Sequence, residues 1–150
     1  MKPLLLILLY FVSVDVNYSD SYQKDAWKCL DNSYKTLLTD PKQSAAYSMQ
    51  AYDILKQTTD SALIVYTLSM SGHAYMLYGN FDLSMNVYYK ALSYCPEKDL
   101  KAKAKINLNL GTLYGSLKDF SKAMELIDLS LIHISEPTRL ALLSRMPSSA

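Results

Sequence analysis

One pattern occurs twice in the middle of the chain, and it limits the possible fold more than any other feature. The first copy, Gly72-x2-Tyr75-x3-Gly79-Asn80-Phe81, returns 39 residues later as Gly111-x2-Tyr114-x3-Lys118-Asp119-Phe120. Self-similarity at a period of about 20 to 50 residues indicates an array of repeated supersecondary units. Within the second copy, apolar residues recur at the spacing of three or four that marks one face of a helix: Ile106, Leu110, Leu113 and Leu117. The repeated unit is therefore helical.

Two glycines lie inside these helical patterns, where glycine costs about 1 kcal/mol relative to alanine. We expect Gly72 and Gly111 to allow a close approach of a partner helix, near Ser84 and Ala123 respectively. No stretch alternates as a strand would, so the sequence predicts an all-α fold. The expected helices lie near residues 21 to 38, 43 to 57, 61 to 78, 81 to 94, 98 to 117 and 120 to at least 128.

The two copies resemble the tetratricopeptide repeat, a helix-turn-helix unit of about 34 residues. The residues that carry the resemblance are Gly72, Tyr75, Gly79, Phe81, Ser84, Tyr88, Ala91 and Pro96, then Gly111, Tyr114, Phe120 and Ala123. Ser71 and Asn107 depart from the family pattern. The resemblance implies antiparallel helix pairs stacked as a right-handed α-solenoid, with repeats at about 25–58, 65–98 and 104–128. The first repeat is degenerate, and Ser44 and Ala51 take its small positions.

In the tetratricopeptide family, the first helices form a concave face that binds another protein or a peptide. The resemblance places the following residues on that face: Tyr66, Ser69, His73, Met76, Lys105, Leu108, Thr112 and Gly115. We expect Tyr66, His73, Met76 and Leu108 to matter for partner binding and little for folding. Repeats that grip a carboxyl-terminal peptide carry Lys and Asn at such places, so Ser69 and His73 argue against a carboxylate clamp. The predicted function is a protein-interaction scaffold.

The sequence predicts neither an enzyme nor a cofactor or metal site. His73 has no Cys, Asp or Glu at ligand spacing, and no nucleophile elbow, zinc-protease motif or phosphate loop occurs. Lys and Arg number 15 against 14 Asp and Glu, a balance that argues against nucleic acid as a partner. Cys29 and Cys95 lie one and a half repeats apart, which favours free thiols and leaves their pairing open.

The start of the chain has the pattern of a secretory signal peptide. Lys2 precedes a largely apolar run from Leu4 to Val14, which predicts a signal over residues 1–19 and an exported protein, periplasmic or associated with the cell envelope. The run is shorter than the roughly 20 apolar residues that span a bilayer. We therefore expect membrane contact only through an uncleaved signal or a segment further along the gene.

The last part of the chain reads differently from the rest. Leu129 to Arg139 corresponds to a translation of the transposon-end adapter of short-read sequencing libraries, and Ser144 to Ala150 is similar to the far end of that adapter. We interpret residues 129–150 as an adapter-derived artefact in an incomplete gene. Residues 20–128 then form the helical domain, with the third repeat interrupted in its second helix. Leu129 to Ile134 are apolar and could still extend that helix.

A second function belongs to signal transduction. Exported, tyrosine-rich repeats of this degenerate kind also resemble the sensory halves of membrane-bound bacterial regulators and kinases, whose output domain would be encoded downstream. An apolar run of about 20 residues further along the gene would favour this alternative. A stop codon soon after the third or fourth repeat would favour a free scaffold.

Overall fold

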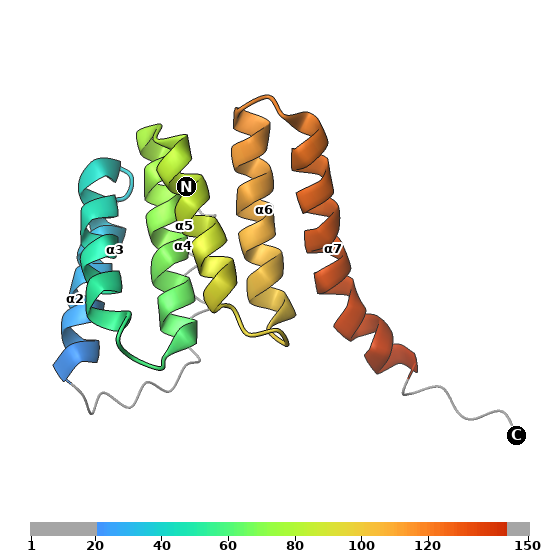
Figure 1. Ribbon diagram of the computed structural model, residues 1–150, viewed down its shortest axis with the longest axis horizontal. Helices are drawn as coiled ribbons and strands as arrows, with labels where there is room; N and C mark the ends of the chain where they lie inside the picture. Colours follow the sequence, from blue (N-terminus) through green and yellow to red (C-terminus); the bar gives the residue numbers. More distant parts are fainter. Residues whose placement is uncertain (1–20, 144–150) are drawn as a thin grey trace, which may run out of the picture.

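The computed structural model describes the backbone of residues 21–143 and the side chains of residues 21–132. This part contains six helices and no strand: α2 (Ser21–Thr36), α3 (Pro41–Leu55), α4 (Ser61–Tyr78), α5 (Phe81–Tyr94), α6 (Leu100–Ser116) and α7 (Phe120–Leu143). Consecutive helices run antiparallel and stand side by side in one row (Figure 1). The all-α helix-pair fold predicted from the sequence is confirmed. The signal peptide predicted at residues 1–19 lies outside the described residues.

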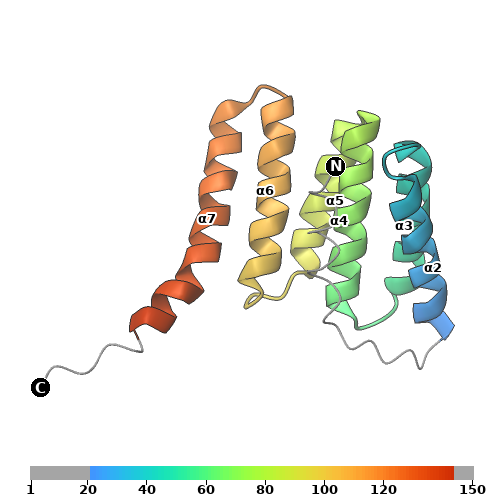
Figure 2. The ribbon, with the colours of Figure 1, turned by 180° about the vertical axis from the view of Figure 1, so that it is seen from behind.

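In the first two pairs, the two helices lie on different sides of the row. In Figure 1, α3 and α5 lie in front of α2 and α4, and from behind the order is reversed (Figure 2). Within the pairs α2/α3, α4/α5 and α6/α7 the helices are in extensive contact, and α3 also packs closely on α4. Each pair buries the apolar face that its neighbour leaves open, which is the reason such pairs form arrays.

Every helix from α3 to α7 begins directly after an Asp or Asn that caps it. The side-chain oxygen of the cap accepts a hydrogen bond from the backbone N–H three residues later: Asp40 from Gln43, Asp60 from Leu63, Asn80 from Leu83, Asp99 from Ala102 and Asp119 from Lys122, at 3.0 to 3.2 Å. These caps explain why two helices begin at residues other than those expected from the sequence. The expected starts near residues 43 and 98 are wrong, because α3 follows its cap Asp40 and begins at Pro41, and α6 follows its cap Asp99 and begins at Leu100.

The turn inside each of the last two pairs has the same backbone conformation. Gly79 has a φ of +85° and Lys118, 39 residues later, a φ of +64°. In both turns the next backbone N–H bonds to the carbonyl five residues earlier, Asn80 to Tyr75 and Asp119 to Tyr114, at 2.9 Å. The second copy thus keeps the left-handed turn although a lysine replaces the glycine.

Small residues bring the two helices of each pair together. The carbonyl of Gly72 accepts a hydrogen bond of 2.7 Å from Ser84 Oγ, and a Cβ at position 72 would lie 2.7 Å from the buried ring of Tyr88. At Gly111, a Cβ would lie 2.9 Å from Ile127 Cγ1 and 3.2 Å from the carbonyl oxygen of Ala123. The close approach expected at both glycines is therefore present, with Tyr88 and Ile127 as additional neighbours.

The first pair makes the same contact with two serines. Ser33 Oγ donates to the Ser44 carbonyl at 2.9 Å, and Ser44 Oγ donates to the Ser33 carbonyl at 2.7 Å. Both serines are fully buried. Ser33 stands 39 residues before Gly72, whereas Ser44 stands 40 residues before Ser84. The segment from Ser33 to Ser44 is therefore one residue shorter than the segment from Gly72 to Ser84, although the connection between α2 and α3 is longer than the one between α4 and α5.

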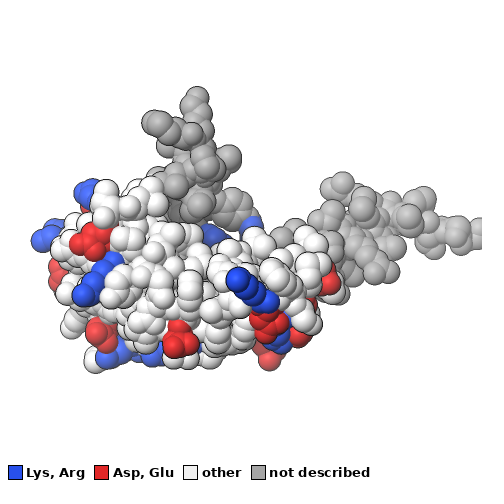
Figure 3. Space-filling view, turned by 90° about the horizontal axis from the view of Figure 1, so that it is seen from above, with Lys and Arg blue, Asp and Glu red and all other residues white. Residues whose placement is uncertain are grey.

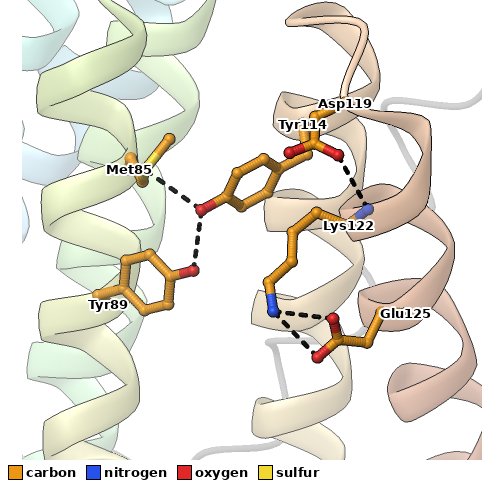
Figure 4. Close-up of polar contacts among 6 residues, drawn as sticks. All are labelled: Met85, Tyr89, Tyr114, Asp119, Lys122 and Glu125. Carbon is orange, nitrogen blue, oxygen red and sulfur yellow. Dashed lines mark hydrogen bonds and ion pairs between the residues drawn. The ribbon is translucent and has the colours of Figure 1, made fainter.

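The contact between α5 and α6 is the least close of the contacts between consecutive helices. Tyr114 of α6 bridges it: its hydroxyl donates to Met85 Sδ at 3.5 Å and lies 3.1 Å from the Tyr89 hydroxyl (Figure 4). The hydrogen bond to Tyr114, together with partial burial, raises the pKa of Tyr89 to about 12. Long side chains thus connect the second and third pairs where the backbones stand further apart.

The last helix, α7, continues through the apolar residues after Asp128 and ends at Leu143. Among the described side chains of this extension, Leu129, Leu131 and Ile132 are exposed and Ser130 is buried. Residues 144–150, the end of the segment interpreted as adapter-derived, lie outside the described residues.

We predict that Gly111→Leu lowers the free energy of unfolding by about 1 to 3 kcal/mol, because the added side chain must displace Ile127 and the α7 backbone. Gly115→Leu, one turn later in α6, is the matched control, since no atom lies within 4 Å of a Cβ there. This control should leave the stability unchanged or raise it. Urea unfolding followed by circular dichroism measures both. Equal effects of the two substitutions would refute the close contact at Gly111.

Candidate functional site

The residues that the sequence placed on the binding face lie on two neighbouring first helices. Tyr66, Ser69, His73 and Met76 are on α4, and Lys105, Leu108 and Thr112 are on α6. The 39-residue repeat of the first helices adds a third set on α2. Trp27 precedes Tyr66, and Tyr34 precedes His73, each by that interval. We call the surface formed by these side chains of α2, α4 and α6 the first-helix face.

Aromatic rings meet on the α2–α4 part of the first-helix face. The ring centroids of Trp27 and Tyr66 are 6.3 Å apart, with an angle of 34° between the ring planes. Burial raises the pKa of Tyr66, and the neighbouring hydroxyl of Tyr34 adds to the effect. Three large rings from two helices are therefore gathered here, which is the kind of surface that supplies contact area at low cost in side-chain entropy.

A histidine and a lysine influence each other electrostatically on the α4–α6 part of the same face. Burial lowers the pKa of His73, and the positive charge of Lys105 lowers it further. Burial also lowers the pKa of Lys105. His73 is therefore held neutral near pH 7, with one ring nitrogen able to donate a hydrogen bond and the other able to accept one.

Not every predicted residue offers its side chain to a partner. Tyr66 and Met76 are half-buried and pack against the hydrophobic core. We therefore expect them to contribute to stability, which corrects the sequence-based expectation that they matter little for folding. Ser69 Oγ and Thr112 Oγ1 donate to carbonyls one turn earlier in their own helices, at 2.8 and 3.0 Å. Leu108, at 46% exposure, is the large apolar side chain that this face leaves open.

Sequence reasoning missed Trp27 and Tyr34 as members of this face. The first repeat was aligned through Ser44 and Ala51 of α3, which precede their equivalents in α5 by 40 residues, whereas the residues of α2 precede their equivalents in α4 by 39. The correct alignment of α2 with α4 is given by the two 39-residue intervals, from Trp27 to Tyr66 and from Tyr34 to His73. A search for the 39-residue period in the first helices alone would have found both.

The residues that define the repeat divide by burial in a way that follows from their contacts. Gly72, Tyr88, Ala91, Gly111 and Ala123 are buried; Tyr75, Phe81 and Tyr114 are half-buried; Gly79, Pro96 and Phe120 are exposed. The buried members lie where the two helices of a pair meet, or beneath the next pair. Both cysteines, Cys29 and Cys95, are free thiols.

The residues that the structure describes contain no group of three His, Cys, Asp or Glu that could hold a metal ion. None of the helices described is both long and apolar enough to cross a membrane. An open depression of about 530 Å³ lies away from the first-helix face, lined by Tyr78, Gly79, Asn80, Phe81, Asp82 and Leu117. Basic and acidic side chains are interspersed on the face shown in Figure 3, and most of that surface is uncharged.

Comparison with protein families agrees with this geometry. The family model described as "Tetratricopeptide repeat" matches residues 65–98 and 104–131. The second and third helix pairs are similar to tetratricopeptide repeats. Their two matched segments start 39 residues apart, the interval that relates the glycines, the turns and the first-helix face. Neither the comparison with curated proteins nor that with solved structures found a match. Tetratricopeptide repeats generally mediate interactions between proteins, through the extended surface that stacked helix pairs create.

We predict a pH dependence of stability from His73. The unfolded chain takes up a proton at His73 near the ordinary pKa of 6.5, whereas the folded protein does so only at lower pH. The unfolded state therefore binds more protons in this window, and folding stability falls as the pH decreases from about 7.5 to about 5. Melting temperatures of the wild type and of His73→Gln measure this effect, because other titrations are common to both. The advantage of the wild type should shrink with decreasing pH, and a constant or growing advantage would contradict it.

Proposed function

We propose that this protein binds an extended peptide segment of another protein along the first-helix face. The proposal is supported by the order in which aromatic and charged side chains lie across the first helices of the three pairs. Trp27 and Tyr34 on α2 lie next to Tyr66 on α4, and the charge of Lys105 on α6 acts on His73 of α4. Stacked helix pairs present such a surface without any further folding.

The partner's chemistry follows from these groups. The partly exposed rings on α2 and α4, and Leu108 on α6, suit an aromatic, proline or branched apolar side chain of the peptide, since interface energy concentrates in a few such anchors. Lys105 suits an acidic side chain, and the neutral ring of His73 suits a backbone amide or carbonyl. We therefore propose a peptide that carries an apolar anchor followed by an Asp or Glu.

Export is part of the same proposal. The pattern from Lys2 to Val14 supports it, and the partner would then be a protein of the periplasm or cell envelope. Cleavage of the first residues during export, measured by mass spectrometry of the mature protein, tests this part separately. The intact initiator methionine on the exported protein would contradict a cleaved signal.

We predict that Leu108→Glu weakens peptide binding at least tenfold, about 1.4 kcal/mol, while it leaves the fold intact. Leu108 is largely exposed, and the new carboxylate would place a negative charge beside Lys105 and in the way of an acidic peptide. Peptides selected on the full chain from a displayed library of random linear sequences supply the ligands. Their affinity is measured through the fluorescence of Trp27, the single tryptophan of the chain, whose surroundings a bound peptide would change.

The matched control is Leu83→Glu on α5. Leu83 has nearly the same exposure, 42%, but belongs to a second helix and lies outside the first-helix face. This substitution should leave affinity unchanged. Loss of binding in Leu83→Glu with retention in Leu108→Glu would place the binding surface on the second helices instead.

A further inference from the structure

Two tyrosines of neighbouring helix pairs meet hydroxyl to hydroxyl between α5 and α6. The Tyr89 and Tyr114 hydroxyl oxygens are 3.1 Å apart, and the two side chains reach toward each other across the gap (Figure 4). The Tyr114 hydroxyl donates to Met85 Sδ at 3.5 Å, so the hydrogen between the two phenols comes from Tyr89. Tyr89 is 42% exposed, whereas Tyr114 is half-buried. A reagent in solution therefore has access to one member of the pair.

The stacking of the helix pairs does not require this second hydroxyl. At the preceding junction, between α3 and α4, Tyr75 stands 39 residues before Tyr114. The place of Tyr89 is taken there by Met49, 40 residues earlier, which is the interval between the second helices α3 and α5. Met49 and Tyr75 both pack against the hydrophobic core. A methionine is thus sufficient to fill this position, and the paired hydroxyls are specific to the junction of α5 and α6.

Paired phenols of this kind are placed for a covalent link between their rings. When a phenol loses an electron and its proton, the unpaired electron is shared between the oxygen and the ring carbons next to the carbon that bears it. Hydroxyls in contact bring these ring carbons of Tyr89 and Tyr114 near one another. The contact between α5 and α6 is the least close between consecutive helices, and exposed side chains rotate rapidly. The rings therefore have both the room and the freedom to complete their approach.

We propose that Tyr89 and Tyr114 form an oxidative crosslinking site, at which hydrogen peroxide acting through a haem peroxidase joins the two rings as dityrosine. Each tyrosine gives up one electron and its phenolic proton. The two phenoxyl radicals form a carbon–carbon bond between ring carbons next to the oxygens, and the hydrogens on the two bonded carbons move to those oxygens. The two electrons and two protons reduce one hydrogen peroxide to two water molecules. Both tyrosines lie outside the first-helix face, so the site does not rest on the proposed peptide binding.

The link would join the second and third helix pairs where consecutive helices are least closely packed. Tyr89 and Tyr114 are 25 residues apart in the sequence. A covalent bond between them closes a loop of that length in the unfolded chain and lowers its entropy, as a disulfide of the same span does. We therefore expect the melting temperature of the linked protein to rise by about 5 °C or more.

The test treats the dilute full chain with hydrogen peroxide and a haem peroxidase. Dityrosine is detected by its blue fluorescence and by the loss of two hydrogen atoms in the mass of the monomer. Fragmentation of tryptic peptides locates it, since Tyr114 is the single tyrosine of the peptide 106–118. We expect a link between Tyr89 and Tyr114, and a melting temperature that rises on treatment of the wild type but not of Tyr89→Phe.

Tyr78→Phe is the matched control. Tyr78 is exposed to a similar extent, 48%, and its ring lies 5.9 Å from the Lys42 ammonium group. Each substitution removes one hydroxyl from an exposed ring, so the fold is kept. The link should form in Tyr78→Phe as in the wild type. Loss of the link in Tyr78→Phe with retention in Tyr89→Phe would overturn the proposal.

A second tyrosine pair provides a comparison within the same molecule. The hydroxyls of Tyr52 on α3 and Tyr94 on α5 are 3.3 Å apart, but Tyr52 is buried and the Lys90 ammonium group lies 4.4 Å from the centre of its ring. We expect a lower yield of dityrosine there, because the oxidant does not reach Tyr52. A higher yield at this pair would overturn the proposal. Dityrosine found only in crosslinked dimers, or oxidation of methionine and Trp27 without any dityrosine, would equally overturn it.

Discussion

The close approach of the two helices in each pair is the contact on which the rest of the structure depends. Gly72 and Gly111 have no room for a side chain, Ser33 is fully buried at the equivalent place in the first pair, and hydrogen bonds from Ser44 and Ser84 to the facing carbonyls fix two of the three contacts. Because this contact recurs at a constant interval in the first helices, α2, α4 and α6 lie in the same relation to their partners. The rings of Trp27 and Tyr66 lie side by side, and the charge of Lys105 acts on His73.

Most of the fold could be predicted from short stretches of sequence, because interactions between residues close in the sequence determine the helices. The caps and the apolar periodicity placed six helices, and the repeated glycines placed their contacts. The two misplaced helix starts follow from the positions of the capping residues. Asp40 caps α3, which therefore begins at Pro41. At this first helical position, the backbone N–H that proline lacks would have no partner within the helix. The left-handed turn at Lys118 was visible in the sequence only through its alignment with Gly79.

The candidate site was less predictable because it depends on register and on burial across helices. One residue fewer between Ser33 and Ser44 than between Gly72 and Ser84 was enough to hide Trp27 and Tyr34 in the alignment. The half-burial of Tyr66 and Met76 could not be derived from their own helix, since the neighbouring pair supplies it. Residues of this kind combine two roles, and substitutions there change stability and binding together. Leu108 and Leu83 separate the two roles because each is exposed on a different helix of its pair.

We infer that the first helices of successive pairs form one continuous surface. Nuclear Overhauser contacts test this directly, since Trp27 is the single tryptophan and its indole signals are unambiguous. Cross-peaks are expected between the Trp27 indole and the Tyr66 ring, whose centroids are 6.3 Å apart. Cross-peaks from Trp27 to residues of α2 and α3 alone, with none to α4, would contradict it.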